Sequence, residues 1–172
     1  MALNEYLEPS SSGFPKRRVA ISTSSGAADA SKIPATNSEG KIDETFFPAG
    51  IGSDSISMTA SESLSAGDFV NVFNDSGTPK VRKADGSQYA KRAVGFVKQS
   101  ASIGSPVTVY FEGTNDSVSG LSTGEEYFLS VATPGEAVTP HNASSANHIV
   151  QLIGRAISTT AISFEPDVKW IQ

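Results

Sequence analysis

The chain has 172 residues, of which 18 are acidic and 13 are basic, and its formal net charge at pH 7 is -5. This charge argues against nucleic acid as a general partner, because phosphate binding needs a basic surface. The absence of cysteine excludes disulfides, thiolate metal ligands and cysteine nucleophiles. Hydrophobic residues make up 38% of the chain, and about one residue in six is serine. We therefore expect a modest core under a surface of small polar side chains.

Residues 1–8, MALNEYLE, predict a short helix. Leu3, Tyr6 and Leu7 follow helical spacing, and Pro9 ends the run. A helix this short is not stable alone, so it is either frayed or docked on a partner through these three side chains. The segment lacks the basic and apolar parts of a secretory signal, and no apolar run in the chain has the length of a transmembrane helix. We predict no membrane partner.

Residues 9–27 have the composition of a loop, with a possible short strand at 19–21. The loop contains the basic cluster Lys16, Arg17 and Arg18. Such a cluster is most often solvated. Here it can also bind an acidic partner surface, and we carry this second interpretation forward as a prediction.

Residues 28–52 form a low-complexity segment without helical or strand period. Small and polar residues surround four isolated apolar positions, Ile33, Ile42, Phe46 and Phe47. The segment buries too little apolar surface to offset its ordering entropy, yet it is too apolar for a free linker. We predict an arm that is ordered on another surface, with the two phenylalanines either docked on a neighbouring subunit or capping the chain's own barrel.

From residue 54 onwards, short alternating runs lie between turn signals, about ten residues apart. This spacing predicts an all-β, compact antiparallel β-barrel or β-sandwich domain at 54–172, preceded by an extended, mostly irregular N-terminal arm at 1–53. The dipeptide Asp85-Gly86 is typical of a hairpin turn. The expected strands lie near 56–58, 69–73, 80–84, 93–97, 107–112, 126–131, 149–157 and 161–164.

Three of the expected strands also predict which side chains share a face. The three sets are Val107, Val109 and Phe111; Tyr127, Leu129 and Val131; and Ile149, Ile153 and Ile157, the last interrupted by the polar Gln151.

Candidates for chemistry are weak. His141 and His148 lie near Glu136, but no Gly-x-Ser-x-Gly nucleophile motif is present. Glu125 and Glu126 are adjacent and would face opposite sides of a strand. The Asn-Asp pairs at 74–75 and 115–116 offer oxygen ligands but lack the spacing of a calcium loop. We predict no enzymatic activity, no cofactor and no metal site.

Residues 29–48, DASKIPATNSEGKIDETFFP, followed by Gly50, Ile51 and Gly52, resemble a segment that recurs in structural proteins of tailed bacteriophages. Residues 120–129, GLSTGEEYFL, and 150–157, VQLIGRAI, are similar to patterns in the same proteins. The resemblance covers about two thirds of the chain and leaves the first 27 residues unmatched.

These relatives include capsid decoration (cement) proteins and head or tail fibre proteins. The resemblance implies a virion structural protein without enzymatic activity, commonly a homotrimer, on the capsid exterior after assembly in the host cytoplasm. Its expected partners are the phage major capsid protein and further copies of the chain. The alternative is a tail fibre or baseplate adhesin that binds a host surface glycan. A third possibility, a polysaccharide depolymerase, requires a pair of carboxylates in a groove.

Overall fold

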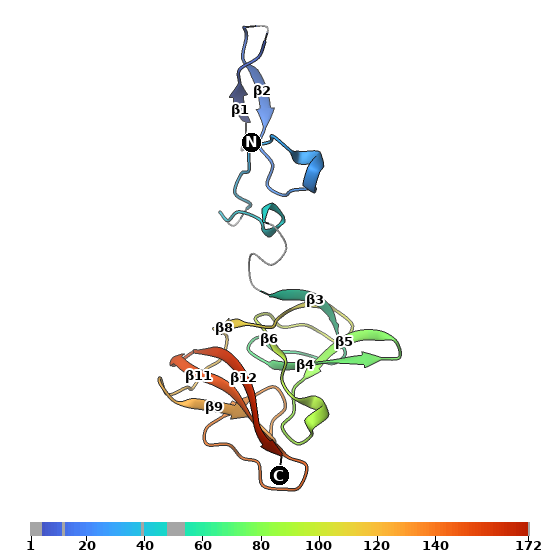
Figure 1. Ribbon diagram of the computed structural model, residues 1–172, viewed down its shortest axis with the longest axis vertical. Helices are drawn as coiled ribbons and strands as arrows, with labels where there is room; N and C mark the ends of the chain where they lie inside the picture. The colour runs from blue at the N-terminus through green and yellow to red at the C-terminus, as the bar shows by residue number, and fades with distance from the viewer. Residues whose placement is uncertain (1–4, 12, 39, 48–53, 172) are drawn as a thin grey trace. The chain divides into compact units, whose positions relative to one another are not determined.

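The computed structural model describes residues 5–11, 13–38, 40–47 and 54–171. The chain divides into two compact units, Met1–Gly52 and Ser53–Gln172, which are coloured blue to cyan and green to red in Figure 1. The regular elements of the described residues are β-strands and short 3-10 helices. The prediction of an all-β chain is therefore confirmed.

The first unit begins with a hairpin of β1 (Glu5–Glu8) and β2 (Lys16–Val19), which pair antiparallel. Two 3-10 helices follow, η1 (Gly26–Asp29) and η2 (Glu44–Phe46). The predicted helix is thus wrong for residues 5–8, where pairing with a charge-complementary strand outweighs the helical spacing. The rest of that prediction, including Leu3, falls on residues outside the described ranges.

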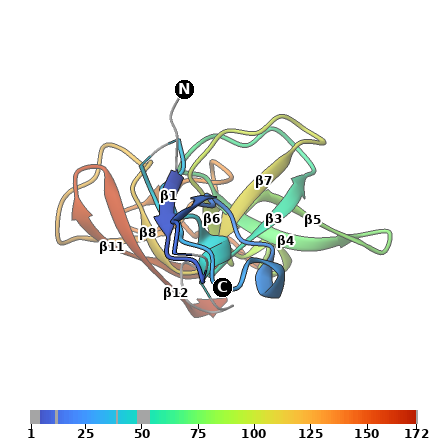
Figure 2. The same ribbon diagram turned by 90° about the horizontal axis from the view of Figure 1, so that it is seen from above.

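The second unit contains a closed barrel of five strands in the order β3-β5-β4-β6-β7. In Figure 2 the barrel strands β3, β4, β5 and β7 lie on one side of this unit, and β11 and β12 lie on the other. β3 pairs parallel with β5, and the other barrel pairs are antiparallel. The strands are β3 (Ser55–Ala60), β4 (Phe69–Asp75), β5 (Thr78–Lys83), β6 (Gly95–Val97) and β7 (Pro106–Tyr110).

The turns around β5 differ in kind. β4 and β5 are joined by Ser76 and Gly77, whose φ angles of 53° and 94° are those of a two-residue type I′ turn. Asp85-Gly86, by contrast, does not form a tight hairpin. The Asp85 carboxylate accepts a hydrogen bond from the Ser87 amide, and the Asp85 amide donates to Lys91. These bonds hold a wider loop, which contains η3 (Tyr89–Lys91) and leads to β6.

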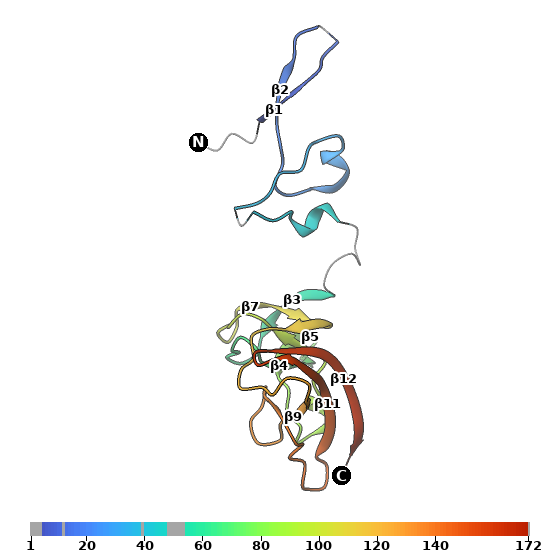
Figure 3. The same ribbon diagram turned by 90° about the vertical axis from the view of Figure 1, so that its left-hand side faces the viewer.

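An antiparallel sheet in the order β10-β9-β11-β12-β8 packs beside the barrel. Figure 3 shows β11 and β12 as long curved strands that lie side by side. The strands are β8 (Gly113–Asn115), β9 (Glu126–Leu129), β10 (Ala137–Val138), β11 (Ile149–Ser158) and β12 (Ala161–Ile171).

Two apolar cores hold this unit together. The barrel interior contains mainly valines, including Val70 of β4 and Val97 of β6. The neighbouring residues Phe69 and Phe96 point out of the barrel and join the core of the sheet. There the ring centroid of Phe164 lies 5.8 Å from that of Phe69 and 5.5 Å from that of Phe96. Barrel and sheet therefore share a core.

A bulge in β11 changes which side chains are buried. Between Leu152 and Gly154, β11 has one residue more than the segment of β9 with which it pairs, so the faces exchange after that point. Ile149 and Ile153 are fully buried, whereas Ile157 is 53% exposed and Ala156 takes the inward position. The prediction of one shared face is wrong for Ile157, because strict alternation does not continue across the extra residue.

Candidate functional site

The first unit has no buried side chain among residues 5–11, 13–38, 40–43 and 45–47. Its most exposed large apolar residues are Leu7, Phe14 and Val19, at 65%, 79% and 65%. Ile33, Ile42 and Phe47 follow at 48%, 44% and 48%, and Phe46 is partly exposed. Six large apolar side chains on so small a unit form a surface that favours contact with another molecule.

The basic cluster is engaged within its own hairpin. Arg17 lies 3.3 Å from the carboxylate of Glu5, and Arg18 lies 2.7 Å from that of Glu8. The hydrogen bond and charge of Glu8 raise the pKa of Arg18. The three basic side chains are exposed, so the pairs are solvated and weak. The structure thus gives this cluster a role inside the hairpin, which the sequence spacing did not indicate.

Strand alternation sorts the hairpin side chains onto two faces. Tyr6, Glu8 and Arg18 share one face, and this face borders a cleft of about 450 Å³ that Val19, Ile21 and residues 30–32 also line. By register, Leu7 lies on the opposite face with Glu5 and Arg17, while Val19, at the end of β2, reaches the cleft. The predicted set Tyr6 and Leu7 is therefore split between two faces, because it was assigned on helical spacing.

The remaining part of the first unit has a defined hydrogen-bonded path. Ile21 donates its amide to Ile33 and accepts from the amide of Ala35. The Ser24 amide donates to the Thr45 hydroxyl at 2.8 Å, which joins segments 21 residues apart. These bonds position Ile33 and Phe46 without burying them.

Carboxylates fix the two short helices of this unit. Lys32 and the Ser25 amide bind the Asp29 carboxylate at 2.6 Å each and lower the pKa of that group. Asp43 accepts from the hydroxyl and amide of Thr45, which likewise lower its pKa. The unit is held by polar contacts in place of a core.

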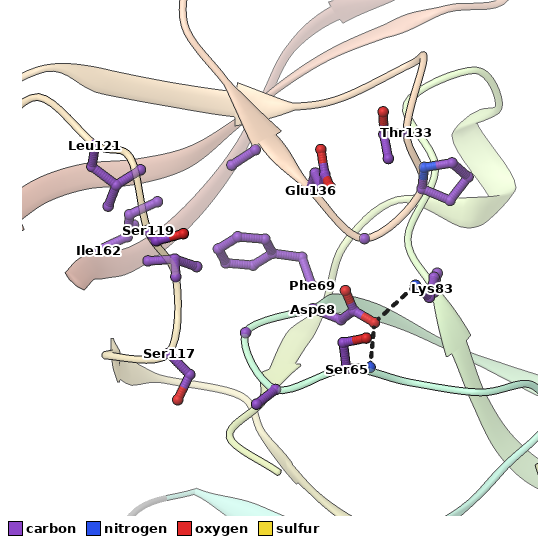
Figure 4. A pocket seen from close by; sticks show the side chains of 16 residues that line it. Ser65, Asp68, Phe69, Lys83, Ser117, Ser119, Leu121, Thr133, Glu136 and Ile162 are labelled. Carbon is purple, nitrogen blue, oxygen red and sulfur yellow. Dashed lines mark hydrogen bonds and ion pairs between the residues drawn. The ribbon is translucent and has the colours of Figure 1, made fainter. Parts of the chain in front are cut away.

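The second unit contains a separate cavity of about 370 Å³. It lies between the β3–β4, β8–β9 and β9–β10 connections. Figure 4 shows an apolar side with Leu121 and Ile162 and a polar side with Lys83, Thr133 and Glu136.

Asp68 is the most buried charged residue at this cavity, with 7% of its surface exposed. Its carboxylate accepts from the Ser65 amide at 2.8 Å and lies 3.2 Å from the Lys83 ammonium. Gly135 passes so close that a Cβ there would lie 2.8 Å from Asp68 Oδ1. Asp68 therefore links the β3–β4 connection to Lys83 of β5 and lies against the β9–β10 loop, and these contacts account for a structural role.

Asp68 and Glu136 both line this cavity, a juxtaposition that the sequence did not indicate because 68 positions separate them. Neither His141 nor His148 is among the lining residues. His148 Nδ1 accepts from the Ser144 amide at 3.2 Å, and the His141 ring packs edge-on against Phe128 at 5.8 Å. The candidate triad near Glu136 is not assembled by these contacts.

No group of three or more potential metal-ligating side chains occurs among the described residues. The described part of the chain also contains no helix long and apolar enough to cross a membrane. Comparison of the sequence and structure with protein-family models, with curated proteins and with solved structures gave no match.

Proposed function

We propose that the protein is a capsid decoration protein of a tailed bacteriophage, whose first unit binds neighbouring major capsid subunits and whose second unit forms a surface knob. The single observation that carries the proposal is the contrast between the units. The second unit has two apolar cores, whereas none of the first unit's side chains whose burial is described is buried, and six large apolar ones are exposed. A unit of this kind gains stability by docking.

The contact would be multivalent. One arm offers Ile33, Ile42 and Phe47 as partly exposed apolar side chains, which is a modest area for binding. Several arms on one oligomer act at a high effective concentration, so weak individual contacts add up to stable attachment. A knob attached through several capsid subunits would resist the internal pressure of packaged DNA.

The adhesin alternative receives less support from the second unit. A glycan-binding face is expected to present clustered aromatic side chains. Among the side chains described between 54 and 169, the exposed large hydrophobic residues are Ile56, Tyr89, Ile103 and Ile157. Tyr89 is the one aromatic residue in this set. The guanidinium of Arg92 lies 4.8 Å from its ring centre, which engages one face of the ring.

The first test compares two triple variants of the full chain in binding to capsids that lack this protein. Replacement of Ile33, Ile42 and Phe47 by alanine removes apolar contacts worth about 1–2 kcal/mol each and should weaken binding more than tenfold. The matched control replaces Ile56, Ile103 and Ile157, which are similarly exposed on the second unit, and should bind as the parent does. Equal binding by both variants would disprove docking through the arm.

A second measurement locates the protein. Immunogold labelling of intact virions with an antibody against residues 54–172 should place gold over the head. Gold confined to the tail would reject decoration and favour the adhesin. Deletion of residues 1–53 completes the test, because the second unit has its own cores and should remain folded while losing capsid binding.

A further inference from the structure

Most basic side chains described in the second unit are paired with carboxylates. Every lysine of its described residues forms an ion pair, at distances from 2.6 to 3.5 Å, and Arg155 pairs with Glu126 at 3.2 Å. Within this described part, Arg82 and Arg92 are the two basic residues without such a partner. The chain has 18 acidic residues against 13 basic ones, so this pair stays uncompensated despite a surplus of acid.

One buried amide positions both arginines. Asn71 of β4 is 3% exposed. Its Oδ1 accepts a hydrogen bond of 2.9 Å from Arg82 Nε, and its Nδ2 donates to the backbone carbonyl of Arg92 at 2.8 Å. Breaking either bond leaves part of a buried amide unsatisfied, which is costly. The Arg82 side chain and the Arg92 backbone are therefore fixed relative to each other.

Both guanidinium groups lie against η3, none of whose residues is buried. That of Arg82 lies 4.4 Å from the Phe73 ring centre and donates to the carbonyl of Ala90 at 3.4 Å. That of Arg92 lies 4.8 Å from the ring centre of Tyr89 and donates to none of the described residues. Stacking on a ring occupies the face of a guanidinium and leaves its N–H edge open.

The charge of this surface indicates which ligand it can hold. Two cations against one short helix repel each other, and an anion that contacts both removes the repulsion. The planar N–H fork of arginine matches the oxygens of phosphate. The net charge of -5 opposes the approach of a long polyanion. These features together favour a single doubly charged group.

We propose that Arg82 and Arg92 form a binding site for one phosphate group, supplied as the free ion or as a small phosphate monoester. Both guanidinium groups donate to its oxygens, and Asn71 acts through Arg82 as a positioning residue. The site lies on the second unit and uses none of the apolar side chains through which the first unit is proposed to dock. The result of the capsid-binding test therefore does not decide it.

The test titrates the full chain with inorganic phosphate at pH 7, with chloride keeping the ionic strength constant because salt screens unspecific attraction. The Nε–Hε NMR signals of Arg82 and Arg92 and the amides of η3 should shift along one saturation curve. Arg82→Gln with Arg92→Gln should raise the dissociation constant about tenfold or more, because charge-assisted hydrogen bonds are lost. The matched control, Lys98→Gln with Arg155→Gln, removes the same charge from cations that already have carboxylate partners and should bind as the parent does.

A conservative variant separates hydrogen-bond geometry from charge. Arg82→Lys with Arg92→Lys keeps the net charge but loses the planar fork, and it should bind severalfold more weakly than the parent. Glycerol phosphate is the second probe: tighter binding than that of inorganic phosphate would assign the group to an ester, and any other order to the free ion. No saturation in the parent, a shift at only one arginine, or undiminished binding by the glutamine or the lysine variant would each overturn the proposal.

Discussion

Gln151 shows how one polar side chain can stabilise a distant loop. It is 2% exposed in β11, and its amide makes two hydrogen bonds of 2.8 Å with the backbone amide and carbonyl of Ala93. The side chain thus makes the pair of backbone hydrogen bonds that a neighbouring strand would make with Ala93, which precedes β6. The sequence shows a glutamine among isoleucines, but not the partner 58 positions away, because that partner is set by tertiary packing.

Replacing Gln151 by leucine should lower the free energy of unfolding by about 2–4 kcal/mol, because two buried backbone groups lose their partners. Urea unfolding of the full chain measures the effect. The control Gln99→Leu, at an exposed position, should change the value by less than about 0.5 kcal/mol. Equal midpoints for the two variants would show that the amide contacts contribute nothing.

Asp85 links stability to pH. Burial alone would raise its pKa, but hydrogen bonds from Ser87 and the charge of Lys91 together lower it. A lowered pKa stabilises the fold above the unfolded value of about 4, and this contribution disappears as pH falls through the folded value. Asp85→Asn should therefore be less stable than the parent at pH 7, and the difference should shrink in urea titrations below about pH 4. A constant difference at all pH values would contradict this.

At the scale of the elements, short strands were the ones the sequence did not predict. β8 and β10 have three and two residues, too few to show a period of two. The longer strands β4, β7, β9 and β11 lie where alternation predicts them. β1 was misassigned because Tyr6 and Leu7, two positions of the helical spacing, also fit a strand whose partner carries the opposite charge.

The β11 bulge can be tested at Gly154. Its φ is 150°, and a Cβ there would lie 1.8 Å from the carbonyl oxygen of Ser163. Gly154→Ala should therefore destabilise the chain by about 2–4 kcal/mol through crowding and strain. At Gly104, with φ of 80° and no atom within 4 Å of such a Cβ, alanine should cost only about 1–2 kcal/mol of strain. Thermal unfolding of both variants distinguishes crowding from strain, and equal losses would remove crowding as the cause.

For the whole molecule, the sequence predicted the fold class and the positions of the longer strands of the second unit, but not the strand order. Alternation is local, whereas the barrel closes by pairing Ile56 with Val109, more than fifty positions apart. The contribution of Phe69 and Phe96 to the sheet core likewise depends on Phe164. The candidate docking residues were found from their isolation in a polar segment, while the cleft and the ion pairs of the hairpin required the structure.

The shared core also bears on synthesis of the protein. A chain emerging from the ribosome presents β4 and β6 long before β12 is made, so the outward rings of Phe69 and Phe96 remain without Phe164 until almost the entire sequence is available. Part of the barrel wall is apolar on both sides, so a barrel without β12 leaves apolar side chains uncovered. Completion of the shared core therefore waits for the last strand, and a ribosome that stops before residue 164 releases a product with an exposed aromatic surface.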